Sequence, residues 1–289
     1  MLELSLACQD IDRSRPIIDG RVAIEGVRLN VITSRPEEIF QRAFRHQEFD
    51  ISELSLSTHL ITTARGNGPY VAIPAFVSRA FRHNAIYVRK DGGVERPEDL
   101  RGRAVGVPDV QQTASVWARG ILADEYGLQR TDVLWRIGGL EQAGREQRVP
   151  LDLKGKIKVE PIGPRPTLSQ MLEDGEIDAL ISPRAPKGFG GNGIVRMFPD
   201  HRAAEEAYFK KTRLFPLMHV IGIRRALVER HPWLPVNVYA AFRQARALAM
   251  QSLNRVDTVV VAHPWIADEI LRVKGVMGED YWPYGIDEN

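Results

Sequence analysis

The chain has 289 residues, which is more than a usual single hydrophobic core holds, so two lobes are expected. Its 39 basic and 37 acidic residues leave a formal net charge of +2, and this balance gives no support for nucleic acid as a partner. Charged residues and prolines interrupt every apolar run before it reaches the length of a membrane span, so no membrane partner is expected.

The N-terminal residues run from Met1 directly into a predicted strand, Leu2–Cys8. They show no basic segment, apolar segment or cleavage site of an export signal, so we expect a cytoplasmic protein. Cys8 is the single cysteine and cannot form an internal disulfide. Its apolar neighbours predict a buried strand residue rather than a nucleophile.

Strand and helix patterns alternate from the start of the chain. Strands rich in β-branched and aliphatic residues are predicted at Leu2–Cys8, Val27–Thr33, Phe49–Ser55, Val71–Phe76 and Ala85–Arg89. Between them, one helix is predicted over Glu37–His46, with Pro36 at its start, and another through Leu60–Ile61 that ends at Gly66.

The alternation continues through the second half. A short helix after Pro97 leads to further strands, predicted at Ala104–Val107, Val133–Ile137, Ile157–Pro161, Ile177–Ser182 and Leu217–Ile223. Helices are predicted at Gln111–Tyr126, Thr167–Glu176 and Arg202–Lys211, and the remaining C-terminal part reads as mostly helical.

This pattern predicts an α/β fold with two lobes, each a mixed, mostly parallel sheet flanked by helices. The stretch Lys90–Gly93 marks a change in composition and predicts a linker, and Leu217–Ile223 is a candidate return strand. We therefore expect residues 1–88 and 218–289 to form lobe 1 and residues 89–217 to form lobe 2, with a ligand cleft between them.

Ligands of open α/β sheets bind beyond the carboxyl ends of the strands, so residues at those ends are candidates. Three of them, Arg79, Arg82 and His83, form a cationic cluster between two strands. An arginine fork matches a carboxylate in bidentate fashion, which favours an anionic ligand. The alternative is a solvated turn.

A second group lies in the predicted second lobe. Gln111 and Thr113 begin a helix, whose free backbone N–H groups favour an anion. Simple capping by Thr113 is the alternative. Arg184 follows a predicted strand and is expected either to bind a carboxylate or to lie exposed in a loop.

Two further candidates are residues that transfer protons. Glu53 lies near the end of a strand beside Ser52 and Ser55, and His219 lies within an otherwise apolar strand. A carboxylate that faces an anionic ligand suits proton transfer better than binding. The alternatives are a surface Glu53 that caps the next helix and a His219 that serves only in the core or hinge.

One run in the predicted second lobe and five further motifs, in order along the chain, carry a resemblance to known proteins. The run Pro97–Val107 resembles the opening of the second lobe in type II solute-binding proteins. The further motifs are Phe49–Ser55, Ser78–Arg89, Gln111–Leu122, Phe215–His219 and Trp282–Gly285. Together they are similar to 4,5-dihydroxyphthalate decarboxylase, an enzyme family with a type II periplasmic-binding-protein-like fold. Members are expected to continue past the last motif, whereas this chain stops at Asn289.

The resemblance implies conversion of 4,5-dihydroxyphthalate to 3,4-dihydroxybenzoate and CO2 in phthalate catabolism. The catalytic residues would be Glu53, as acceptor of a phenolic proton, and His83 or His219, as the proton donor to the ring. The residues expected to bind the substrate are Ser52, Ser55, Arg79, Arg82, Gln111, Thr113 and Arg184.

Two other functions stay open to the sequence: a solute-binding protein for an aromatic carboxylate, and another enzyme of this fold such as one of alternative menaquinone synthesis. No cofactor is predicted, because the chemistry needs no electron sink beyond the ring. Histidine spacing offers no metal site, although the sequence does not decide whether a divalent metal assists. It also does not decide whether the chain forms a homo-oligomer.

Overall fold

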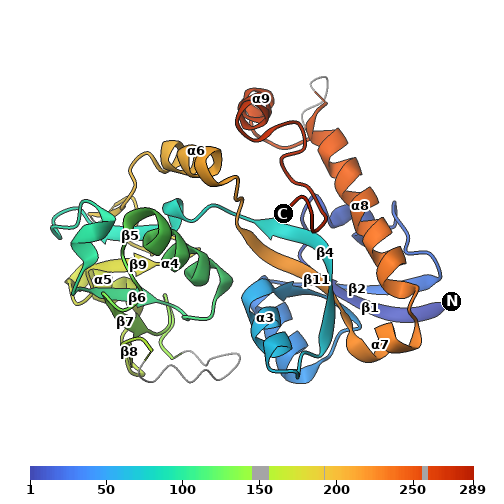
Figure 1. The fold of residues 1–289 in the computed structure, drawn as a ribbon, viewed down its shortest axis with the longest axis horizontal. Coiled ribbons are helices and arrows are strands. Elements are labelled where there is room, and N and C mark those ends of the chain that lie inside the picture. Colours follow the sequence, from blue (N-terminus) through green and yellow to red (C-terminus); the bar gives the residue numbers. More distant parts are fainter. Residues whose placement is uncertain (145–155, 192, 256–259) are drawn as a thin grey trace. The chain divides into compact units, whose positions relative to one another are not determined.

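The computed structural model describes residues 1–144, 156–191, 193–255 and 260–289. The chain divides into two compact units. The first unit comprises Met1–Arg79 and Thr212–Asn289, and the second comprises Ala80–Lys211. Each unit is built on its own β-sheet, as Figure 1 shows.

The sheet of the first unit has five strands in the order β2-β1-β3-β11-β4. They are β1 (Leu2–Cys8), β2 (Val27–Thr33), β3 (Ile51–Ser55), β4 (Tyr70–Arg79) and β11 (Leu217–Arg224). β1 runs parallel to β2 and β3, whereas β11 runs antiparallel to both β3 and β4. The strand that returns after the second unit therefore lies between two strands that precede it.

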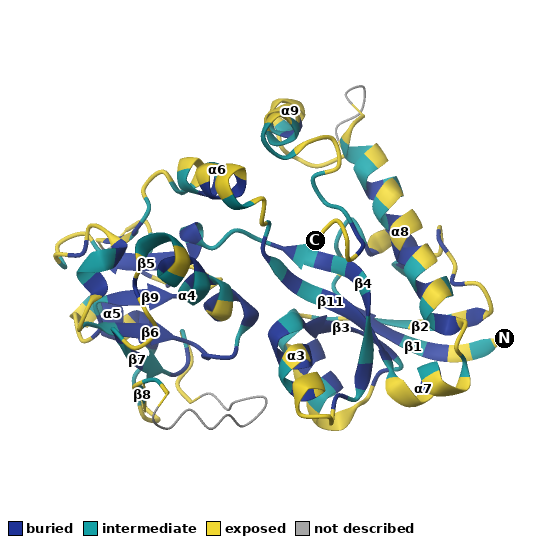
Figure 2. Cartoon of the chain, viewed as in Figure 1, coloured by how far each residue is buried: buried dark blue, intermediate teal, exposed yellow. Residues whose placement is uncertain are grey.

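Helices cover both faces of this sheet. The helices of this unit are α1 (Arg15–Ile18), α2 (Pro36–Gln41) with a π-helical turn at Arg42–His46, α3 (Leu56–Ala64), α7 (Arg225–Arg230), α8 (Leu234–Leu253) and α9 (Ile266–Met277), and α2 and α8 are among those that pack on the sheet. Val238 and Phe242 of α8 are fully buried in one hydrophobic cluster with the sheet. Ile39 and Phe40 of α2 belong to a second cluster with Leu54 of β3. Figure 2 shows the buried strands and the exposed outer side of α8.

The second unit contains a six-stranded sheet in the order β10-β5-β9-β6-β7-β8. Its strands are β5 (Ile86–Arg89), β6 (Ala104–Val107), β7 (Leu134–Ile137), β8 (Val159–Pro161), β9 (Ala179–Ile181) and β10 (Ile194–Arg196). Its helices are α4 (Thr113–Tyr126), α5 (Leu168–Asp174) and α6 (His201–Thr212), with 3-10 turns at His83–Ala85 and Pro97–Leu100. Leu122 of α4 and Leu172 of α5 lie in separate buried clusters, so this sheet too is a layer between helices.

The predicted elements agree with these bounds to within a few residues, and the mixed α/β architecture is confirmed. Local signals were reliable where a side chain or a glycine sets the element's end. Thr167 caps α5 by accepting from the backbone N–H of Gln170 at 3.2 Å. Gly127 ends α4 in the left-handed conformation with φ of 65°. No helix in the described part of the chain is long and apolar enough to cross a bilayer.

The predicted linker at Lys90–Gly93 needs correction. It is a turn within the second unit, because β5 just before it pairs with β9 and β10. The chain passes between units at Arg79–Ala80 and again at Lys211–Thr212, so β5 belongs to the second unit rather than to lobe 1. Glycine marks a local reversal of the chain, and it does not show which sheet the preceding strand joins.

Gly222 in β11 allows a close approach of buried side chains. A Cβ atom at this position would collide with Cδ1 of Leu54 and lie 3.1 Å from Cβ of Tyr70. Neither neighbour is solvent-exposed, so neither can move aside. Gly222→Ala should therefore destabilise the protein by about 1–3 kcal/mol, measured from the midpoint of urea unfolding.

The matched control for Gly222→Ala is Gly120→Ala. Gly120 lies in α4, and no atom would come within 4 Å of the added Cβ. This variant should keep or gain stability, by up to about 1 kcal/mol, because alanine favours a helix over glycine. Equal midpoints for the two variants would contradict the packing argument.

Candidate functional site

Two predicted catalytic residues, Glu53 and His219, meet in the first unit. Nδ1 of His219 lies 2.6 Å from Oε1 of Glu53, although the two residues are 166 positions apart in the sequence. The pairing of β3 with β11 explains this contact. Glu53 lies opposite Ile221 and Ser55 lies opposite His219, so Glu53 and His219 are diagonal neighbours across the antiparallel pair.

The Glu53 carboxylate has no solvent exposure, and three donors surround it. Besides His219, Gln9 donates its backbone N–H to Oε2 at 2.9 Å and its side-chain amide to Oε1 at 2.6 Å. Burial alone would raise the pKa of Glu53, but the hydrogen bonds and charge of His219 and the two donors of Gln9 hold it below its usual value. Glu53 is therefore an ionised carboxylate in a buried position.

The Glu53 carboxylate determines how the imidazole of His219 is presented. An ionised carboxylate accepts only, so Nδ1 carries the hydrogen of this contact and Nε2 is the ring nitrogen left for a ligand. Phe40 of α2 meets the ring edge-on, with 4.8 Å between ring centroids. His219 retains 17% of its side-chain exposure, in contrast to Glu53. The pair is thus a fixed imidazole supported by a hidden carboxylate.

This geometry corrects the role predicted for Glu53. A fully buried carboxylate whose two oxygens are held by Gln9 and His219 does not face a ligand, so it does not itself take a phenolic proton. Its contacts are with His219 and Gln9 instead. The alternative of a surface Glu53 that caps the next helix is also wrong, because Glu53 is completely buried.

The two predicted serines differ in their surroundings. Ser55 lies opposite His219 at the start of α3, where its hydroxyl accepts from Thr58 Oγ1 at 3.2 Å and lies 3.4 Å from Ser57 Oγ. The hydroxyl of Ser52 instead donates to the backbone carbonyl of Glu53 at 2.9 Å. Side chains alternate along a strand, so Ser52 points to the face opposite that of Glu53 and Ser55. Ser55, and not Ser52, is placed beside His219.

Arg79 ends β4 in the same unit and is only 7% exposed. Its guanidinium donates to the carbonyl of Pro283 and to the side chain of Asn289, and no carboxylate among the described residues pairs with it. Burial lowers the pKa of Arg79 to about 10. A buried cation whose protein partners are neutral favours a bound anion.

The rest of the predicted cationic cluster lies in the second unit, because Arg79 and Arg82 fall on opposite sides of the unit boundary. Arg82 is half-buried, and burial lowers its pKa to about 10. His83 is 1% exposed and has the aromatic rings of Phe198 and Tyr208 against it, at centroid distances of 5.2 and 5.4 Å.

The environment of His83 differs sharply from that of His219. Burial lowers the pKa of His83 to about 4, so its ring is neutral at physiological pH. Its Nδ1 is buried without a hydrogen-bond partner among the described residues. A neutral histidine within an aromatic cluster suits packing better than delivery of a proton.

The remaining predicted binding residues also belong to the second unit. Gln111 and Thr113 are buried at the start of α4, just beyond β6, and the backbone N–H of Gln111 donates to Asp109 at 3.0 Å. Arg184 is exposed in the loop after β9, and its backbone N–H donates to Ser182 at 3.2 Å. These residues lie where the rule of strand ends predicted them.

Gln9 is the functional candidate that the sequence prediction missed. It follows β1 directly, so the rule that selects polar residues beyond strand ends would have included it. Its contact with Glu53 depends on the pairing of β1 with β3, which the local sequence does not indicate.

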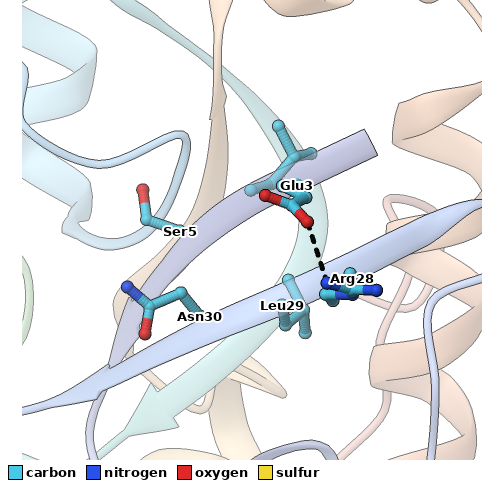
Figure 3. A pocket seen from close by; sticks show the side chains of 6 residues that line it. Glu3, Ser5, Arg28, Leu29 and Asn30 are labelled. Atoms are coloured by element: carbon cyan, nitrogen blue, oxygen red, sulfur yellow. Dashed lines mark hydrogen bonds and ion pairs between the residues drawn. The ribbon is translucent and has the colours of Figure 1, made fainter. Parts of the chain in front are cut away.

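A surface pocket on the strands β1 and β2 offers no competing site. Figure 3 shows its lining, which includes Ser5, Leu29 and Asn30 together with the ion pair of Arg28 and Glu3, 2.9 Å apart. The charges of Arg28 and Glu3 in this pocket neutralise each other, so the pocket has no net positive charge that would attract an anion. Nor do the described residues contain a cluster of three or more His, Cys, Asp or Glu side chains that could hold a metal ion.

Two solved structures share the fold of this chain. The periplasmic aliphatic sulphonate-binding protein SsuA from Escherichia coli matches with a TM-score of 0.51 at 14% identity, over 96% of this chain and 79% of that protein. The alkanesulfonate-binding protein SsuA from Xanthomonas axonopodis pv. citri, bound to MOPS, matches with a TM-score of 0.50 at 10% identity, over 98% and 85%. The expected periplasmic-binding-protein-like fold is therefore confirmed.

Sequence relatives are much closer. No family model matches the chain. A 4,5-dihydroxyphthalate decarboxylase from Comamonas testosteroni is 43% identical over 290 residues, which span 100% of this chain and 88% of that protein. Another from Pseudomonas putida is 45% identical over 211 residues, which span 72% of this chain and 82% of that protein. The chain therefore belongs to the 4,5-dihydroxyphthalate decarboxylase family.

Proposed function

We propose that the protein is a carboxy-lyase that converts 4,5-dihydroxyphthalate to 3,4-dihydroxybenzoate and CO2 in phthalate catabolism. Membership of the family supports the reaction. The observation that carries the chemistry is the contact between Glu53 and His219, because it presents a protonatable imidazole beside the end of a strand.

The proposed reaction needs one proton at the ring carbon that loses its carboxylate. The hydroxyl para to that carboxylate donates electron density into the ring, and Nε2 of His219 delivers its proton to the ipso carbon. The electrons of the breaking C–C bond then return to the ring as CO2 leaves. The dianionic substrate gains one proton and becomes a monoanion, and His219 regains a proton from solvent.

Each group of the first unit has a distinct part in this reaction. Glu53 is a positioning residue, since its negative charge stabilises the imidazolium and fixes the ring. Arg79 supplies the buried positive charge for a substrate carboxylate. We assign the proton to His219 rather than to His83, because burial among aromatic rings lowers the pKa of His83 to about 4, so its ring is in the neutral, weakly acidic form at physiological pH.

A solute-binding protein for an aromatic carboxylate is the less favoured function. Such a protein needs cationic anchors, but it gains nothing from a buried carboxylate that orients a histidine.

The other predictions stay predictions: the cleft between lobes, ligand contacts from Arg82, Gln111, Thr113 and Arg184, the absence of a cofactor, and the cytoplasmic location. Size-exclusion chromatography with light scattering would establish the oligomeric state, and cell fractionation would establish the location.

Glu53→Gln should lower kcat by about 10²–10⁴-fold, with little change in KM. The amide offers a single acceptor oxygen where three donors now converge, and it removes the charge that supports the imidazolium. Release of CO2 from 4,5-dihydroxyphthalate measures the effect. Glu3→Gln is the control, because Glu3 is an exposed carboxylate of β1 whose partner is Arg28. Wild-type turnover by Glu53→Gln would refute the role of the pair.

The two histidines should separate in the same assay. His219→Gln should abolish turnover while the fold is kept, since it removes the proposed proton donor. His83→Phe should keep kcat within a few-fold, because a phenyl ring suits the aromatic cluster and nothing charged is lost. Circular dichroism would verify folding of both variants. Loss of turnover in a folded His83→Phe variant, with activity kept in His219→Gln, would reverse the assignment.

Arg79→Met should weaken binding of the dicarboxylate by about 2–5 kcal/mol, which is at least about 30-fold in Kd. The thioether keeps much of the apolar stem and removes the charge. Isothermal titration calorimetry with 4,5-dihydroxyphthalate and with its neutral dimethyl ester tests this, and only the dianion should lose affinity. Arg28→Met, at an exposed ion pair, is the control. Equal losses for diacid and diester would exclude Arg79 as the anion anchor.

A further inference from the structure

Gln9 makes two hydrogen bonds to one buried carboxylate. Its backbone N–H lies 2.9 Å from Oε2 of Glu53, and its side-chain Nε2 lies 2.6 Å from Oε1. The backbone donor would be present for any residue other than proline at this position. Only the carboxamide contact depends on the identity of the side chain.

The carboxamide of Gln9 reaches the oxygen that His219 also uses. Oε1 of Glu53 receives both Nε2 of Gln9 and Nδ1 of His219, each at 2.6 Å. Donors on both oxygens keep the carboxylate from rotating, so Oε1 stays aimed at the imidazole. A carboxamide is uncharged and does not ionise at physiological pH. It therefore donates to the carboxylate without competing for the proton that His219 would transfer.

The titratable groups near Glu53 show why this neutral donor matters. His219 contacts it from β11, and Cys8 of β1 interacts with it electrostatically. Burial, and then the negative charge of Glu53, raise the pKa of Cys8 to about 12, so the thiol stays neutral and supplies no compensating charge. Gln9 and His219 are thus the groups that favour the ionised form of the buried carboxylate.

We propose that Gln9 is a positioning residue of the decarboxylase, which acts through Glu53 to hold the ring of His219 in the tautomer with its hydrogen on Nδ1. The proposal rests on the proposed function for its effect on turnover. It extends the pair of Glu53 and His219 to a hydrogen-bonded chain of three residues: Gln9 after β1, Glu53 of β3 and His219 of β11.

Gln9→Met tests the side-chain contact, because it keeps the chain length and the backbone N–H and removes the donor. Loss of a hydrogen bond to the charged form raises the pKa of Glu53, so the acidic limb of the pH profile of kcat/KM should move to higher pH. At neutral pH, kcat should fall about tenfold, with KM little changed. Gln170→Met is the matched control, since Gln170 also donates to a carboxylate, that of Asp174, on an exposed helix surface.

A second measurement needs no turnover. The ¹⁵N shifts of the His219 imidazole, assigned by comparison with His219→Gln, report the tautomer directly. The wild-type protein and Gln170→Met should show the hydrogen on Nδ1, and Gln9→Met should show a mixture of tautomers. Gln9→Glu should perturb the tautomer further, because an acceptor then replaces the donor.

These measurements separate two kinds of failure. A folded Gln9→Met variant with the wild-type pH profile and the wild-type tautomer would overturn the proposal for Gln9. If the wild-type protein released no CO2, the proposed function would fail, and the ¹⁵N shifts would still decide whether Gln9 fixes the ring of His219. A changed tautomer together with a shifted acidic limb would support both.

Discussion

The burial of one ionised carboxylate is the constraint on which the site depends. Glu53 has no solvent exposure, so its charge is tolerated only where donors surround it. Those donors are Gln9, which directly follows β1, and His219 of β11, and the strands β1 and β11 flank β3. In the sequence, β11 follows the whole second unit. The site therefore combines residues from the two segments of the first unit that the second unit separates.

The burial of Glu53 bears on how a site for an anionic substrate can contain a carboxylate. A carboxylate facing an anionic ligand in a desolvated site would repel it. Glu53 is completely buried and contacts His219, which keeps 17% of its side-chain exposure, so the imidazole separates the carboxylate from a ligand bound at the exposed side of the ring. In the proposed reaction, the pair of Glu53 and His219 would supply the acid chemistry, and the carboxylate would remain out of contact with the anionic substrate.

The two candidate histidines show that residue type does not determine chemical role. His219 contacts a carboxylate and keeps part of its surface open, whereas His83 lies among aromatic rings with an unpartnered nitrogen. His83 follows two arginines and His219 lies in an apolar strand, and neither local composition predicts the surroundings that the structure gives the two rings. The three-dimensional neighbours distinguish them, because a buried carboxylate contacts the ring of His219, whereas burial among aromatic rings lowers the pKa of His83.

The sequence by itself determined the order and type of the elements, since hydrophobic period and turn residues are local signals. It also placed Glu53, Ser55 and Arg79 at or near strand ends, where the fold class puts ligands, and it singled out His219 as a histidine within an apolar strand. Tertiary structure alone decided that Glu53 and His219 touch across 166 residues, that Gln9 completes the contact, and that β5 joins the second sheet. Strand pairing decides these features, and the register between two distant strands cannot be predicted from the local sequence of either strand.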